Sequence, residues 1–323
     1  MTAKLGLVAR KAGGALLTLA FVVVFNFVLF RVLPGDPAKT FTRNQPSTPE
    51  RLAEIRRSYG FDQPLTEQFR RYVVGLLHGD LDRSYRFKQP VADVIGDRLW
   101  ATVLLMTTSV VLAAALGLWL GARGGWRRGS ALDHATTNTS LAFYAMPESW
   151  LGLMLLVLLT PSGLFPTGGI RSPGMDPWSP AGIADLLWHM TLPCLTLTLI
   201  YLAQYTLVMR SSILDERRSD YLTTARAKGL RDQLVLRRHA LPNALLPSVT
   251  LIFLSLGFVI SGAITVETAF SWQGLGQLSY EALRGPDVPL LQGLFLVFSA
   301  AVIGMNLLAD LLLPVLDPRV RPS

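Results

Sequence analysis

The sequence contains few of the side chains from which metal and catalytic sites are built. Of its 323 residues only Cys194 is a cysteine, and its four histidines fall in different loops and span ends. One cysteine excludes an internal disulfide and a cysteine cluster for a metal, and no zinc spacing occurs. No facing nucleophile and base stand out in the apolar segments, which disfavours a membrane-embedded hydrolase. We therefore expect no catalytic, cofactor-binding or metal residues in this chain.

Charge is also scarce, since 16% of the residues are charged and 50% are apolar. Mean hydropathy is +0.39, a balance that is wrong for a soluble domain of this size. A membrane-spanning helix needs roughly 20 mostly apolar residues. Six segments qualify, near residues 12–32, 101–122, 136–160, 189–209, 246–269 and 290–313. The sequence predicts an all-α polytopic membrane protein with six transmembrane helices.

The first apolar segment also resembles a secretory signal, because Lys4, Arg10 and Lys11 precede it. Its run from Ala12 to Phe30 is longer than the apolar part of a signal, and no small-residue cleavage site follows before Arg31. We expect it to remain as an anchor.

The net charge of +8 is explained by where the basic residues lie, without nucleic acid as a partner. Basic residues precede the first predicted span, lie between the second and third, and follow the sixth, and seven more, from Arg217 to Arg238, lie between the fourth and fifth. The short loops on the other side carry only Arg171 and Arg284. The positive-inside rule then places both termini in the cytoplasm. Most of the seven tryptophans fall near span ends, where interfacial anchoring explains them.

Three regions follow from this topology. Residues 1–32 form an N-terminal anchor span, 33–98 an extracytoplasmic cap segment, and 99–323 a five-span core with a cytoplasmic loop at about 211–245. Within the cap, Thr48-Pro49-Glu50 has the composition of a helix start, and a second amphipathic helix is expected over 66–77. These helices are too polar to span the membrane, so we expect them to form a helical insert on the outer surface.

Two carboxylates are candidates for a translocation path. Glu148 follows Pro147 near the middle of the third predicted span; the proline should kink that helix, and an intramembrane carboxylate is costly enough to suggest function. Acceptance of a hydrogen bond beside the kink is an equally good interpretation. Glu267 is expected at the outer end of the fifth span, close to water, where a structural role is favoured and a gate contact stays open. Asn306 and Asp310 are interpreted as interhelical contacts that pair with Arg210 or another inner arginine.

The stretch between the fourth and fifth spans carries the clearest pattern. Asp220 to Lys228 has few β-branched residues and no glycine or proline, which predicts a short helix. Gly229 permits a sharp turn at its end, and a second helical stretch from Asp232 to Ala240 leads to Pro242. Two short helices at an angle would form a rigid knob on which a partner can dock, although a solvated basic loop that serves only topology is the simpler alternative.

The spacing of these residues resembles the cytoplasmic loop signature of bacterial ABC importer permeases. That signature has a Glu-Ala-Ala triplet, then a glycine, and ends in an apolar-x-Leu-Pro sequence. Here Thr223-Thr224-Ala225 occupies the triplet, Gly229 the glycine and Leu241-Pro242 the end, and His239 replaces an aliphatic residue.

The departures from the general signature resemble the dipeptide, oligopeptide and nickel importer permeases, specifically the first of their two paired subunits. The resemblance covers nearly the whole chain. It rests on Tyr221-x-x-Thr224-Ala225-Arg226-Ala227-Lys228-Gly229-Leu230, His239-Ala240-Leu241, Leu33-Pro34-Gly35-Asp36-Pro37, Gly79-Asp80-Leu81, Arg210-Ser211-Ser212, the segment from Gly262 to Trp272, Gly274-Leu275-Gly276, Asn306-Leu307-Leu308-Ala309-Asp310 and Asp317-Pro318-Arg319-Val320-Arg321. Gln273, Asp82 and Glu148 depart from the family pattern.

The resemblance implies the ABC importer permease (MetI-like) fold and a transport subunit that is not itself an enzyme. Its implied partners are a second homologous permease, two ATPase subunits or domains, an extracytoplasmic substrate-binding protein and membrane lipid. ATP and Mg²⁺ would belong to the ATPase subunits, because this chain has no G-x-x-x-x-G-K-[ST] phosphate loop. The implied ATPase-coupling residues are Tyr221, Thr223, Thr224, Ala225, Arg226, Ala227, Lys228, Gly229, His239, Leu241 and Pro242.

The implied location is the bacterial inner membrane, and the implied cargo is a di- or oligopeptide, with nickel or another metal chelate as the alternative. An alternative of another class is a stand-alone secondary transporter. Such a protein would more typically show inverted repeats with broken helices and would need no docking loop. This sequence has the loop and no obvious internal repeat.

Overall fold

The computed structural model describes residues 2–32, 48–58, 62–259, 263–285 and 287–316. The motif residues 33–37, Gly262 and 317–321 lie outside these ranges. The first half of the described chain forms α1 (Thr2–Phe27), η1 (Val28–Val32), α3 (Pro49–Ser58), α4 (Leu65–Leu77), α5 (Val91–Trp126), α6 (Ala131–Ala145), α7 (Glu148–Leu159) and η2 (Thr160–Ser162). The second half forms α8 (Pro180–Glu216), α9 (Asp220–Ala227), α10 (Asp232–Val235), η3 (Leu236–Ala240), α11 (Leu241–Val259), α12 (Ile264–Ala269), α13 (Leu275–Arg284) and α14 (Val288–Leu316).

The predicted all-helical membrane fold is confirmed. Five helical segments are long and apolar enough to cross a membrane, and the total is six if the bent pair α6 and α7 counts as one span. In the described part of the chain the only β-type pairing is an isolated bridge between Arg83 and Pro90. The helix α3 begins at Pro49 and α4 ends at Leu77, close to the expected positions.

The third and fifth predicted spans are not the continuous helices that the sequence suggested. Between α6 and α7 the axis turns by 103°, because Met146 and Pro147 both have extended backbone and a residue before proline avoids the helical region. Helix α11 ends at Val259, and Glu267 lies in the separate short helix α12. Pro147 therefore breaks the helix instead of kinking it, and the prediction of one helix over 246–269 is wrong.

The centre of the fold is the pairing of α5 with α8. Gly117, Gly121 and Gly125 recur every fourth residue on the face of α5 that meets α8. A Cβ atom at Gly117 would lie 2.8 Å from the Tyr205 Cβ, and one at Gly121 would lie 2.5 Å from the Thr206 carbonyl oxygen. Small residues at this spacing let two helix backbones approach closely, so the stripe fixes α5 against α8.

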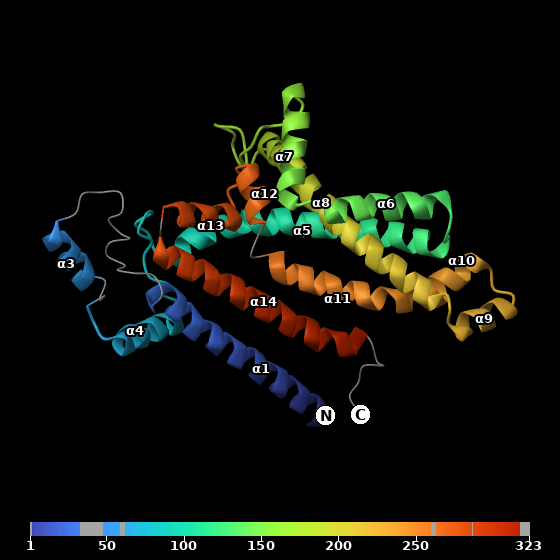
Figure 1. The fold of residues 1–323 in the computed structure, drawn as a ribbon, viewed down its shortest axis with the longest axis horizontal. Helices are drawn as coiled ribbons and strands as arrows, with labels where there is room; N and C mark the ends of the chain where they lie inside the picture. The colour runs from blue at the N-terminus through green and yellow to red at the C-terminus, as the bar shows by residue number, and fades with distance from the viewer. Residues whose placement is uncertain (1, 33–47, 59–61, 260–262, 286, 317–323) are drawn as a thin grey trace.

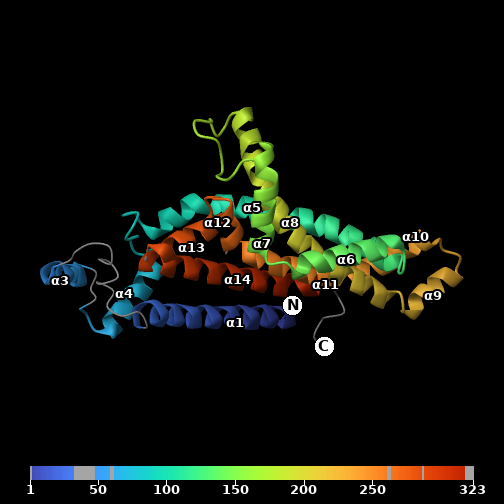
Figure 2. The same cartoon turned by 45° about the horizontal axis from the view of Figure 1, so that its top comes forward.

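Figure 1 shows α9 and α10 at one end of the bundle, which we call the loop end, and α3 and α4 at the opposite end, the insert end. Helix α1 runs beside α14, and the buried Asn26 side chain joins them by donating to the Gln292 carbonyl oxygen at 3.0 Å. The same amide donates to the Tyr72 hydroxyl of α4 at 3.2 Å. Helix α7 and the following loop project from the layer of long helices in both views (Figures 1 and 2).

Candidate functional site

The residues from Asp220 to Pro242 fold as a small unit at the loop end, which we call the two-helix loop. Both predicted helices are present, as α9 and as α10 continued by the π-helical turn η3. The unit has its own core, formed by four buried side chains: Leu222, Ala225, Val235 and Ala240. Of the predicted coupling residues, Ala225 belongs to this core, whereas Thr223, Thr224, Arg226, Ala227 and Lys228 are exposed. The unit therefore has a packed inner face and a free outer face.

The turn between the two helices depends on Gly229. Its φ is +82°, a region that L side chains rarely occupy. The Leu230 N–H donates to the Ala225 carbonyl and the Gly229 N–H to the Arg226 carbonyl, at 3.4 and 2.9 Å. This is a Schellman motif, which satisfies the last carbonyls of α9. Leu230 also packs against the same small core as Ala225, so the turn closes both hydrogen bonds and an apolar contact.

Trp126, the last residue of α5, fastens the two-helix loop to the bundle. Its indole N–H donates to the Asp232 carboxylate at 2.6 Å. The guanidinium groups of Arg226 and Arg217 lie 5.4 and 5.8 Å from its ring centroid, within cation–π range. The ring packs against the core of the loop and against the cluster of Met209 and Ile213 at the end of α8. The sequence predicted only an interfacial anchor for Trp126. Its role in the loop was not predicted, because its partner Asp232 is far away in the sequence.

Tyr221 joins three elements at the base of the same unit. Its hydroxyl donates to the Glu216 carboxylate at the end of α8 and accepts from the Asn243 side-chain amide of α11 at 2.8 Å. Asn243 also donates to the His239 carbonyl oxygen at 3.2 Å. His239 thus contributes its backbone, and Leu241 packs on the Met209 cluster. Pro242 is exposed in the first turn of α11.

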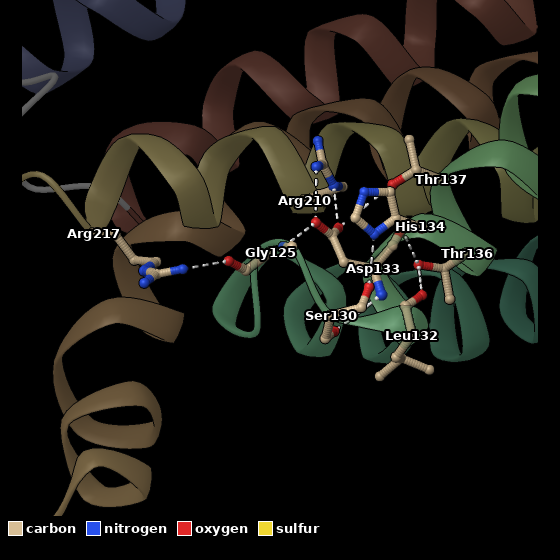
Figure 3. A network of polar contacts seen from close by, with 10 residues as sticks. Gly125, Ser130, Leu132, Asp133, His134, Thr136, Thr137, Arg210 and Arg217 are labelled. Atoms are coloured by element: carbon tan, nitrogen blue, oxygen red, sulfur yellow. Dashed lines mark hydrogen bonds and ion pairs between the residues drawn. The ribbon is translucent and has the colours of Figure 1, made fainter.

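An ion pair between Asp133 and Arg210 ties α6 to α8 (Figure 3). Arg210 donates from Nε and Nη2 to the two carboxylate oxygens at 2.6 and 3.1 Å. The Gly129 N–H also donates to Asp133, at 2.9 Å, and the Asp133 side chain is only 4% exposed. A charge buried to this extent needs its partner, because removing one member of such a pair leaves the other uncompensated.

This geometry corrects the expected pairing of Arg210 with α14. Asp310 instead forms an ion pair with Lys11 of α1 at 3.0 Å. Two turns beyond Arg210, Arg217 donates to the Gly125 carbonyl at 3.2 Å. The end of α8 is therefore bound to α5 and α6 as well as to the two-helix loop.

The two path candidates lie on α7 and α12, away from the loop end (Figure 1). Glu148 is the first residue of α7 and is half-buried. A carboxylate in this position is stabilised by the positive end of the helix dipole. Its position at the start of α7 is thus a structural explanation for Glu148 at the helix break. A role for Glu148 in the translocation path stays a prediction.

Glu267 is fully buried, so the expectation that water lies close to it is wrong. Its carboxylate accepts from the Thr102 hydroxyl at 2.9 Å and from the N–H groups of Gly276 and Gln277 at 2.8 and 3.1 Å. Its helix α12 lies outside the candidate spans. Burial raises the pKa of this carboxyl to about 7, against the opposing effect of the three hydrogen bonds. Glu267 therefore joins the N-terminus of α13 to α5. This is the structural role that the sequence favoured over a gate contact.

No three His, Cys, Asp or Glu side chains in the described ranges are grouped so that they could hold a metal ion. The candidate site is the two-helix loop, a unit that is anchored to α5, α8 and α11 and has an exposed face.

In the comparison with known proteins, both parts of the chain match families of transport-system membrane components. Residues 99–322 match the family described as "Binding-protein-dependent transport system inner membrane component". Residues 4–106 match the family described as "Binding-prot-dependent transport system membrane comp, N-term".

Among similar proteins, the dipeptide transport system permease protein DppB of Escherichia coli K12 is 36% identical over 332 residues, covering 97% of this chain and 98% of that protein. The oligopeptide transport system permease protein AppB of Bacillus subtilis is 33% identical, covering 93% and 94%. The di/tripeptide transport system permease protein DppB of Pseudomonas aeruginosa is 33% identical, covering 98% and 99%. This chain belongs to the family of inner membrane components of binding-protein-dependent transport systems, the ABC importer permeases, and is a transport subunit and not an enzyme.

Proposed function

We propose that this chain is a permease subunit that forms, with a second homologous permease, the membrane path of an ATP-driven peptide importer. The cargo is a di- or oligopeptide, as the names of the relatives indicate for those proteins. None of the three names a metal, so nickel is the weaker alternative. A substrate-binding protein delivers the peptide at the insert end, and two ATPase subunits, which hold ATP and Mg²⁺, bind at the loop end.

The observation that carries this proposal is the two-helix loop with its packed inner face and exposed outer face. An ATPase subunit that contacts Thr223, Thr224 and Lys228 would push on a unit with a packed core of its own, because Leu222 and Val235 are fully buried in it. Trp126 and Tyr221 pass that displacement to α5, α8 and α11. Rigid movement of these helices against the partner permease would expose the path to one side and then the other.

In the proposed orientation both chain termini and the two-helix loop lie in the cytoplasm. The basic residues Arg226 and Lys228 at the end of α9 and Arg237 and Arg238 on η3 support this, since positive charge is retained on the cytoplasmic side. The insert with α3 and α4 then lies outside, where a binding protein arrives.

The test is reconstitution of this chain into vesicles with a second permease, the ATPase subunits and the binding protein. Import of a labelled dipeptide should require ATP and every component. Omission of the ATPase subunits serves as the control, and should abolish import without removing this chain from the membrane. Import by this chain alone without ATP would identify a secondary transporter and refute the proposal.

A further inference from the structure

A cavity of about 430 Å³ lies beside α12 and α13, away from the two-helix loop. Its volume falls within the range of roughly 300–1,000 Å³ that is usual for small-molecule sites. The side chains that matter for binding come from α12, α13 and the loop before α5, and are Arg86, Thr268, Gln277, Tyr280, Glu281 and Arg284. The proposed mechanism of ATPase coupling uses none of them.

Two polar atoms of this cavity are buried without a hydrogen-bond partner in the described structure. They are the Thr268 hydroxyl oxygen and the Gln277 side-chain carbonyl oxygen. Buried acceptors without partners are costly and uncommon in folded proteins. A ligand that donates N–H groups would satisfy them.

The charges of the cavity are suited to a small molecule that carries both signs. Glu281 and Arg86 form a loose pair at 3.6 Å, with side chains that are 24% and 50% exposed. Arg284 makes no ion pair within the described ranges and lies 5.7 Å from the ring centroid of Tyr280. Its guanidinium is left to bind a carboxylate, for which its forked donors are well matched.

The walls of the cavity are held in place from two sides. Glu267 fixes the start of α13 by accepting from the N–H of Gln277. The fully buried Asp287 accepts from the Arg86 N–H at 3.1 Å and from the Ser84 hydroxyl at 2.5 Å. Ser271 lines the cavity with a φ of +50°, a conformation that is uncommon outside glycine and is found where the surroundings impose it. The cavity is therefore formed before any ligand arrives.

We propose that this cavity binds the peptide cargo, with the peptide carboxylate on Arg284, its ammonium group toward Glu281 and its N–H groups donating to Gln277 and Thr268. This assignment rests on the proposed function and makes the permease itself a contributor to peptide recognition. A carboxylate side chain of the binding protein has the same chemistry, so the experiment must separate the two sources.

Binding is measured by saturation-transfer NMR with alanyl-phenylalanine on the assembled permease and ATPase complex without its binding protein. Arg284→Gln should weaken binding on the order of tenfold, the effect of losing one charge-assisted contact. The C-terminally amidated dipeptide should bind the unaltered complex about as weakly. Arg71→Gln is the matched control, because Arg71 is 59% exposed on α4 and lies outside the cavity.

Equal binding of the free and amidated peptides, or unchanged binding by Arg284→Gln, would overturn the assignment. So would a variant that only raises the concentration of binding protein needed to stimulate the ATPase, since that result would show a protein-docking contact. Any of these results would refute the peptide site but would not affect ATP-driven import by the unaltered transporter. Absence of that import would instead refute the proposed function.

Discussion

The turn at Gly229 offers a sharp test of the two-helix loop, because it separates backbone conformation from side-chain space. A Cβ atom built on Gly229 would have nothing within 4 Å, so a larger side chain meets no steric obstacle from its neighbours. The cost comes from the φ of +82°, which is about 1–2 kcal/mol for an ordinary L residue and greater for a β-branched one. We therefore expect Gly229→Val to be harmful and Gly229→Asn to be tolerated, since asparagine enters this region readily.

A penalty of about 1–2 kcal/mol shifts the equilibrium between the closed and opened turn by a factor of roughly 5–30. Gly229→Val should therefore insert into the membrane at the normal level and lower ATP-driven dipeptide import several-fold, while Gly229→Asn should retain most of it. Import into vesicles with the full set of subunits measures both, with the amount of inserted chain determined on the same samples. Equal import by the two variants would refute the argument that the left-handed turn matters.

Three further predictions concern the anchors. Tyr221→Phe removes the hydroxyl that bonds to Glu216, so peptide imported per ATP hydrolysed should fall while ATPase activity persists; an unchanged ratio would show that this bond carries no coupling. Asp133→Asn leaves Arg210 without its counter-charge and should destabilise the purified transporter by about 1–3 kcal/mol, with partial recovery of the melting temperature on adding Arg210→Gln; no drop in the single variant would count against the ion pair. The folded protein holds the Glu267 proton more tightly than the unfolded chain does. The stability of the unaltered protein relative to Glu267→Gln should therefore be lost as the pH rises from about 4.5 to about 7. A difference in melting temperature between the two that does not change across this range would contradict the raised pKa of the buried carboxyl.

The features that the sequence predicted well are local ones. Long apolar runs specify spanning helices through their own composition, and α9, Gly229 and α10 follow from propensity and turn chemistry within about twenty residues. The exposed and buried faces of α9 were not predicted, because Ala225 is buried in a cluster with Val235 and Ala240, which lie beyond the turn.

The features that the sequence did not predict depend on contacts between distant segments. Asp133 and Arg210 are 77 residues apart and Trp126 and Asp232 are 106 apart, and no local pattern pairs them. Glu267 was expected near water because α11 was extended through it, whereas it turns back to accept from Thr102 of α5. A single sequence shows that Pro147 disturbs a helix, but the size of the bend is set by what α6 and α7 pack against.

The central claim is that the exposed face of α9 contacts an ATPase subunit. A photo-crosslinking amino acid at Thr224, which is exposed on α9, tests it directly in the assembled transporter. The same probe at Thr66, exposed on α4 at the insert end, is the control. Thr224 should yield an adduct with the ATPase whose amount changes when ATP is added, and Thr66 should yield none. Failure of Thr224 to crosslink to the ATPase, with the transporter assembled and active, would contradict the account.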